Sequence, residues 1–119
     1  MRVKFRVRIY SKEGKRLSKE DFFKHSDPIY KAMRYVMEFK YLEATKWLMV
    51  SRDCMEKYLL LGLLSIALGQ EREGLEFLQE ATKHQKLTDY VFAVEKPEEG
   101  FKFTIERIEA SLPDFLLSL

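Results

Sequence analysis

The opening stretch MRVKFRVRIY, residues 1–10, alternates apolar and cationic side chains without interruption. Its apolar side chains are Val3, Phe5, Val7 and Ile9. The cations between them are Arg2, Lys4, Arg6 and Arg8. Only a β-strand has a side-chain period of two, so these residues predict a strand with one apolar face and one basic face. The chain therefore contains more than the helices that follow.

A second β-rich region near the C-terminus provides partners for this strand. Residues 90–94 are typical of a strand, residues 96–100 of a turn, and residues 101–106 alternate again. The apolar side chains of the last segment are expected to point inward: Phe101, Phe103 and Ile105. We expect one antiparallel sheet of three strands, whose apolar face covers the helices.

The segment after the opening strand carries turn and helix-start signals. Residues 11–14 predict a turn that ends at Gly14, and residues 15–17 are expected to form a short returning strand. Ser18 and Asp21 have the spacing of a capping box, which predicts a short helix. Asp27 followed by Pro28 marks the start of the next helix.

Five further helices are expected. Residues 28–52 hold no Gly or Pro after Pro28 itself, and the apolar period slips around residues 38–41, which favours two helices with a tight turn over one long helix. Asp53 and Glu56 are spaced as a second capping box for a helix over 54–68, and Gly69 suits its C-terminal cap. Another helix spans about 71–85, and a short one is expected at 114–119, after Pro113.

Residues 58–83, YLLLGLLSIALGQEREGLEFLQEATK, resemble a tetratricopeptide repeat, a helical hairpin with small residues where its helices cross. The positions that carry the resemblance are Gly62, Gly69, Gly74, Phe77, Leu78 and Ala81. Two helices approach closely only where side chains are small. The resemblance implies an antiparallel hairpin and a role in binding other proteins.

A weaker copy of the same pattern lies thirty residues upstream, over 28–52. Its matching positions are Ala32, Glu43, Ala44, Trp47, Leu48 and Ser51, and Phe39 stands where the turn glycine is expected. Repeat proteins of this kind stack three or more hairpins, because one hairpin cannot bury its own face. With two hairpins, the sheet must supply the missing cover.

Both copies also depart from the family on their inner face. Polar residues that hold a partner's terminal carboxylate in the family correspond here to the apolar Ile29, Met33, Leu59 and Leu63, so that clamp is missing. The helix around residues 58–68 is apolar nearly all round, which predicts a buried, central helix. The sequence thus predicts an α+β fold of about five helices on a three-stranded sheet.

The 119 residues are expected to form a single domain: a strand and turn over 1–17, helices over 18–86, a β-hairpin over 90–107 and a short helix or tail over 111–119. The only cysteine, Cys54, allows no internal disulfide, and no run of about 20 apolar residues could cross a membrane. These features favour the cytoplasm. Asparagine is absent and 34% of residues are charged, which favours a hot environment.

Signals for chemistry are sparse. The histidines, His25 and His84, lie in a polar connector and in the last turn of a predicted helix, and Cys54 suits a buried apolar position better than a reactive one. The acidic residues Glu71, Glu73, Glu76 and Glu80 follow helical spacing on a solvated face. We find no zinc spacing, phosphate loop or nucleophile motif, so we expect no enzyme, metal or cofactor.

The first functional hypothesis is a protein-interaction module, with another protein or a second copy of the chain as partner. Its candidate binding residues are those of the apolar C-terminus: Phe115, Leu116 and Leu117. Exposed apolar patches on small proteins usually contact partners. The alternative is that this tail folds back onto its own core.

The second hypothesis is nucleic-acid binding through the basic N-terminal region. Residues 1–19 hold eight basic residues and one acidic residue, a net charge of +7, whereas the remaining hundred residues carry −5. The candidate phosphate contacts are Arg2, Lys4, Arg6, Arg8, Lys12, Lys15 and Arg16, and Tyr10 could stack on a base. The alternative is cross-strand pairing with Glu95, Glu106 or Glu109, or an edge strand kept soluble by charge.

Overall fold

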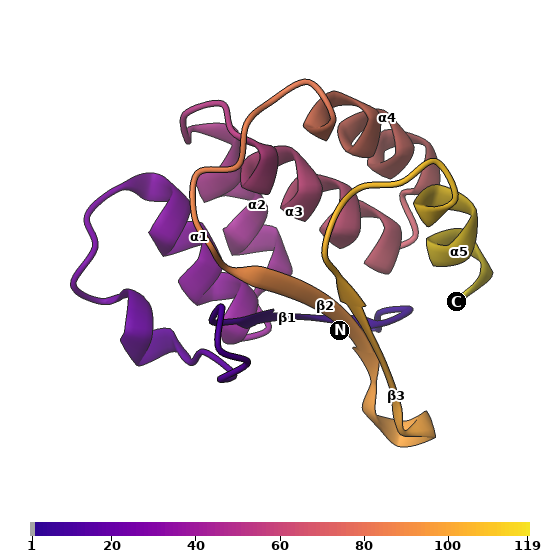
Figure 1. The fold of residues 1–119 in the computed structure, drawn as a ribbon, viewed down its shortest axis with the longest axis horizontal. Helices are drawn as coiled ribbons and strands as arrows, with labels where there is room; N and C mark the ends of the chain where they lie inside the picture. The colour runs from indigo at the N-terminus through magenta and orange to yellow at the C-terminus, as the bar shows by residue number, and fades with distance from the viewer. Residues whose placement is uncertain (1) are drawn as a thin grey trace.

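The computed structural model describes residues 2–119, and Met1, the first residue of the predicted strand, lies outside the described residues. Within this range, five α-helices form a layer and a three-stranded antiparallel sheet lies across one side of it (Figure 1). The α+β class, the number of helices and the composition of the sheet are confirmed.

The sheet has the order β1-β2-β3, with β1 at Arg6–Tyr10, β2 at Val91–Lys96 and β3 at Phe101–Ile105. The opening strand is therefore shorter than predicted. Before it, the backbone N–H of Lys4 donates to the carbonyl of Ala67, 2.8 Å away, so this segment bonds to a helix end instead of extending the ladder. The predicted alternation holds, because Phe5, Val7 and Ile9 are buried.

The hairpin between β2 and β3 turns through a single 3₁₀ turn, Pro97–Glu99, and Gly100 leaves it at φ 66°, a value that favours glycine. On β3, Ile105 is buried and Phe101 is half-buried. Phe103 also points inward as predicted, since it lies opposite the buried Val94 and its ring packs on Phe115, but 38% of it remains exposed. β3 is the last strand of the sheet, so the core covers its inner face only in part.

The connection from β1 to the helices contains the predicted turn, with Gly14 at φ 90°. The returning strand is wrong: only an isolated bridge joins Tyr10 to Arg16. The predicted capping box is confirmed at a short 3₁₀ helix, Lys19–Phe22, where the Ser18 N–H donates to the Asp21 carboxylate at 2.8 Å.

The helical part comprises α1 (Pro28–Met37), α2 (Tyr41–Met49), α3 (Met55–Ala67) and α4 (Glu71–Ala81). Residues 28–52 form two helices, as the slip in apolar period predicted. Asp27 caps α1 by accepting the Ile29 N–H at 3.0 Å. α4 ends four residues earlier than predicted, and the last helix, α5, spans Leu112–Ser118.

The capping box predicted at Asp53 and Glu56 is wrong. Cys54 is the N-cap residue of α3 and makes no side-chain cap bond. The Asp53 carboxylate instead accepts from Lys57 and Tyr58. Glu56 is buried and turns toward the connection between α4 and β2, where it accepts hydrogen bonds from residues 87 and 88.

The two hairpins, α1–α2 and α3–α4, share one backbone geometry at an offset of thirty residues. In each, the helix ends, a residue adopts positive φ and a new helix begins two residues later. The corresponding bonds are Glu38 N to Arg34 O and Leu68 N to Leu64 O, Phe39 N to Val36 O and Gly69 N to Ile66 O, and Lys40 N to Tyr35 O and Gln70 N to Ser65 O. The internal repeat inferred from the sequence is therefore present in the backbone.

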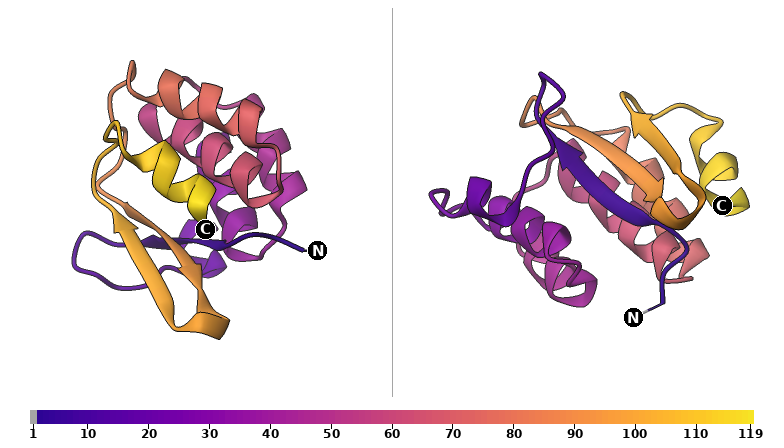
Figure 2. Two further views of the ribbon diagram at one scale, coloured as in Figure 1. Left: turned by 90° about the vertical axis from the view of Figure 1, so that its right-hand side faces the viewer. Right: turned by 90° about the horizontal axis from the view of Figure 1, so that it is seen from below.

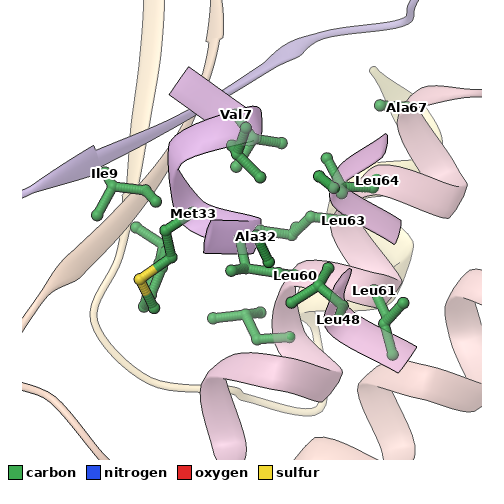
Figure 3. Packing of buried hydrophobic residues seen from close by; sticks show 14 of the residues in the cluster. Val7, Ile9, Ala32, Met33, Leu48, Leu60, Leu61, Leu63, Leu64 and Ala67 are labelled. Carbon is green, nitrogen blue, oxygen red and sulfur yellow. The ribbon is translucent and has the colours of Figure 1, made fainter. Parts of the chain in front are cut away.

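The hydrophobic core lies where β1 crosses the first helices of both hairpins. Figure 3 shows Val7 and Ile9 of β1 pointing toward Met33 of α1 and Leu63 of α3. All four are completely buried. The sheet thus covers the inner helices, as predicted. α3 is central: most of its residues are buried.

Close approach of α3 and α4 depends on two glycines that face each other. A Cβ on Gly62 would lie 2.8 Å from Leu78 side-chain atoms, and one on Gly74 would lie 2.5 Å from Ile66 Cγ1. No side chain fits at either position without displacement. This confirms the predicted role of small residues at the crossing.

Candidate interaction surfaces

The face of the sheet opposite the helices carries three of the seven predicted phosphate-binding side chains: Arg6, Arg8 and Arg16. The register places Arg6, Glu95 and Lys102 in one row across the strands, and Arg8, Ala93 and Thr104 in the next. Arg16 pairs with Tyr10 on the edge of β1 and continues this face. No helix covers it in any view (Figures 1 and 2). The face therefore carries four cations and one carboxylate.

Internal contacts occupy part of this basic face. Arg8 Nε lies 3.3 Å from Glu95 Oε1, and both side chains are 12% exposed. The Tyr10 hydroxyl donates to the other Glu95 oxygen at 2.6 Å, and the Lys102 ammonium lies 4.0 Å from the Tyr10 ring centroid. The cross-strand pairing with Glu95 that the sequence left open is thus present.

The remaining predicted cations fall into two groups. Lys4 forms an ion pair with Glu71 at 3.1 Å, and the Arg6 guanidinium lies 4.5 Å from the Phe39 ring centroid. Four others are exposed and form no ion pair within residues 2–119: Arg2, Lys12, Lys15 and Arg16. Within residues 2–119, neither Glu106 nor Glu109 forms an ion pair with β1, and Glu109 binds Arg107 at 3.0 Å instead.

The apolar C-terminus folds onto its own chain. Leu116 is fully buried, and the Phe115 ring lies 4.4 Å from the Phe103 ring and 6.1 Å from that of Phe101, measured between centroids. Lys96 Nζ donates to the Leu119 carbonyl at 2.7 Å. Of the three candidate partner-binding residues, Phe115 and Leu117 are half-buried, and Leu116 is inaccessible.

An apolar ridge on and just after α2 is an exposed feature that the sequence did not predict. Leu42, Met49 and Val50 are 61%, 56% and 67% exposed. Leu42 and Met49 are seven residues apart and so share one helix face. Beside them, Lys31 lies 4.7 Å from the ring centroid of the half-buried Trp47. The sequence did hold a signal for this ridge: α2 contains more apolar residues than the three that it buries in the core.

A groove of about 870 Å³ runs between β3 and α5. The lining residues on the strand side are Phe103, Thr104, Ile105, Glu106 and Arg107, and those on the helix side include Leu112 and Phe115. Figure 2 shows α5 next to β3, at the margin of the sheet farthest from β1. The exposed Phe103 ring therefore lies in a groove beside an edge strand.

The cysteine and the two histidines, which are the side chains most often used in catalysis, each have defined surroundings. Cys54 is buried, and burial raises the pKa of its thiol, which disfavours the thiolate. His25 stacks on Tyr30 with 4.2 Å between ring centroids. His84 lies beyond the end of α4, not in its last turn as predicted, and its Nε2 is 3.0 Å from a Glu80 oxygen. This bond lowers the pKa of Glu80.

The acidic face predicted on α4 is solvated and takes part in surface ion pairs, such as that between Glu76 and Arg72. Residues 2–119 contain no group of three or more His, Cys, Asp or Glu side chains placed to hold a metal ion. Among the described residues, no helix has the length and apolar character to span a membrane.

Comparison of the chain with protein-family models, with curated proteins and with solved structures gives no match.

Proposed function

We propose that this chain is a non-catalytic protein-interaction module, and that the apolar ridge of α2 is its recognition surface. The observation that carries the proposal is the exposure of Leu42, Met49 and Val50. Exposed apolar side chains with charged neighbours are typical of a protein contact, because their burial is favourable and the polar groups set orientation. The ion pair of Lys46 with Glu43 supplies such groups.

The arrangement of the hairpins supports this choice of surface. The inner face of the helices is filled by β1, and the C-terminal Leu116 is buried, so neither is free for a partner. The outer side of α2 is not needed for the core, which takes Tyr41, Ala44 and Leu48 from this helix. A partner can thus bind the ridge without unfolding any element.

The test compares an altered ridge with a matched control. We expect the wild-type chain to retain a specific protein from extracts of its source cells, and the double variant L42E/M49E to lose it. Arg72→Glu adds a carboxylate at an exposed position of α4 and should retain the partner. Circular dichroism checks that all variants are folded. Capture that is absent, or equal for L42E/M49E and wild type, contradicts the proposal.

A second candidate function is nucleic-acid binding on the open sheet face, favoured by the placement of Arg6, Arg8, Arg16 and Lys102 around the half-buried Tyr10. Cations beside an aromatic ring are typical of surfaces that bind single strands. Fluorescence anisotropy with a labelled oligonucleotide should show affinity that falls steeply with salt, and the variant R6E/R16E should weaken it. Binding that is absent or insensitive to salt rejects this candidate.

The setting in which the module works also belongs to the proposal. A lone buried cysteine suits a reducing cytoplasm, and many surface ion pairs with no asparagine suit a hot environment. Thermal unfolding of the purified chain above about 80 °C would support the second point, since mesophilic domains cluster at about 45–65 °C.

A further inference from the structure

The two edges of the sheet differ in how their backbone groups are satisfied. On β1, the Val7 N–H donates to the Tyr41 hydroxyl at 2.8 Å, and the Ile9 carbonyl accepts the Leu17 N–H at 2.9 Å. Within residues 2–119, no segment outside the sheet makes a backbone hydrogen bond to Phe101–Ile105 of β3. The outer edge of β3 is therefore open to another strand.

We propose that a second copy of this chain occupies that edge, with the two β3 strands antiparallel and related by a two-fold axis beside Thr104. The two sheets then form one sheet of six strands. The inference rests on the proposed function in one respect only, that protein recognition is the role of the chain. It uses a different surface from the α2 ridge.

Charge complementarity between Lys102 of β3 and Glu106, which directly follows the strand, selects this occupant and this register. With Thr104 on the axis, Lys102 lies opposite Glu106 of the second copy, and the reverse pair forms by symmetry. Phe103 lies opposite Ile105 of the second copy, and the two Thr104 side chains meet. Opposite charges, apolar pairs and Thr–Thr pairs each stabilise antiparallel strands.

The neighbouring two-fold registers lack this complementarity. Opposite residues in an antiparallel pair point to the same face, so the axis must pass beside one residue and not between two. An axis at Lys102 places two ammonium groups opposite each other. An axis at Phe103 sets Lys102 against Thr104, and an axis at Ile105 sets Phe103 against Arg107. Only the axis at Thr104 forms two ion pairs.

The exposed Phe103 and the groove beside it fit the same arrangement. In the Thr104 register, Phe101–Ile105 of the second copy runs alongside residues 103–107, which are the end of β3 and the two residues after it and which line the groove. The apolar side chains that face α5 would then be covered, including the 38% of Phe103 that is exposed in the single chain. Glu106 is exposed and forms no ion pair within residues 2–119, so it is available for the contact.

The test is the solution mass of full-length chains by sedimentation over a range of concentrations. The wild type should reach twice the 14.2 kDa mass of one chain. Glu106→Lys removes no contact within the chain but places a second ammonium group opposite Lys102, and it should weaken the dimer about tenfold or more. Glu98→Lys makes the same charge change in the adjoining turn, outside the paired residues, and should leave the dimer unchanged.

Charge reversal then identifies the register. K102E/E106K restores two opposite-charge pairs and should return the dimer toward wild-type affinity, while circular dichroism confirms folding. A wild type that stays monomeric overturns the inference. So does a dimer that E106K leaves intact, or one that K102E/E106K fails to restore. L42E/M49E should keep the dimer, so loss of partner capture and loss of the dimer report separately on the proposed function and on this inference.

Discussion

The first hairpin, α1–α2, and the second, α3–α4, follow the same backbone path thirty residues apart but differ in how they are packed. At their crossing, Ala32 and Ala44 of the first correspond to Gly62 and Gly74 of the second. The second hairpin lies at the centre of the molecule, where α3 is buried on nearly every side. The difference shows that one backbone design accepts either residue. Ala32 and Ala44 are also fully buried, so close packing at the crossing, and not burial, decides how small the residue must be.

The largest expected effect comes from an anchor that only the second hairpin has. Glu56 at the start of α3 is fully buried and accepts hydrogen bonds from the Leu87 N–H and from the backbone and hydroxyl of Thr88. Glu56→Ala leaves these donors without a partner, and we expect a loss of about 3 kcal/mol of unfolding free energy in urea.

Ser26, thirty residues before Glu56, is the matched control, because it precedes α1 and makes no side-chain hydrogen bond within residues 2–119. Ser26→Ala should change stability by less than about 0.5 kcal/mol. Equal losses of unfolding free energy for Glu56→Ala and Ser26→Ala would mean that the buried carboxylate gives the second hairpin no extra stability.

The next effect measures the helix crossing itself. Gly74→Ala puts a methyl group 2.5 Å from Ile66 Cγ1 and 2.9 Å from the Gly62 carbonyl. Backbone oxygen cannot rotate away, so we expect a loss of about 2 kcal/mol despite the better helix propensity of alanine. The reverse change in the first hairpin, Ala44→Gly, should cost about 1 kcal/mol. Denaturant unfolding of both variants measures which loss of unfolding free energy is larger. A Gly74→Ala variant more stable than the wild type would contradict the prediction.

The sequence predicted the elements that rest on local pattern: the alternating strand, the caps at Ser18 and Asp27, and the glycine pair at the crossing. It also predicted that the sheet covers the helices, because two hairpins cannot shelter their own apolar faces. Its errors arose where a side chain had a choice of partner. Glu56 had the spacing of a capping box, but its carboxylate accepts hydrogen bonds from the distant backbone of residues 87 and 88 instead.

Surfaces were predicted less well than the core. Composition located the basic strand, yet only the register shows that Arg8 lies against Glu95 and that Phe103 is at an edge. The α2 ridge was not predicted, because Leu42 and Met49 have the spacing of core residues in a short amphipathic segment. Which apolar residues remain exposed depends on tertiary packing that a single sequence does not encode in a periodic pattern.

A smaller effect tests whether the two turns are equivalent. Phe39 adopts φ 61° where the second hairpin has Gly69 at φ 88°, and only glycine takes such values without strain. Phe39 remains there because its ring packs on Tyr41, with 5.0 Å between centroids, and beneath Arg6.

Phe39→Ala should therefore be less stable than Phe39→Gly by about 1 kcal/mol, and Gly69→Ala should be less stable than the wild type by the same amount. The comparison cancels the loss of the Phe39 ring, since both variants at this position lack it. Thermal and urea unfolding give the two differences. If they disagree by more than about 0.5 kcal/mol, the turns are not equivalent.

The smallest effect concerns a hydrogen bond of α3 that α1 cannot form, because Pro28 stands thirty residues before Tyr58. The Tyr58 hydroxyl donates to Asp53 Oδ1 at 2.7 Å, and this bond to a carboxylate raises the pKa of Tyr58 to about 12. The folded pKa is above the ordinary tyrosine value, so the bond stabilises fully below pH 10 and is lost as pH rises through 12.

Spectrophotometric titration of the phenolate band measures this directly. Asp53→Asn removes the acceptor charge, so one phenolate should form nearer pH 10, and Tyr58→Phe should remove that step altogether. Glu73→Gln, at an exposed carboxylate of α4, should leave the titration unchanged. An unaltered titration curve for Asp53→Asn would mean that the hydrogen bond to Asp53 does not raise the pKa of Tyr58. The start of α3 would then have no stabilising bond that α1 lacks at this position.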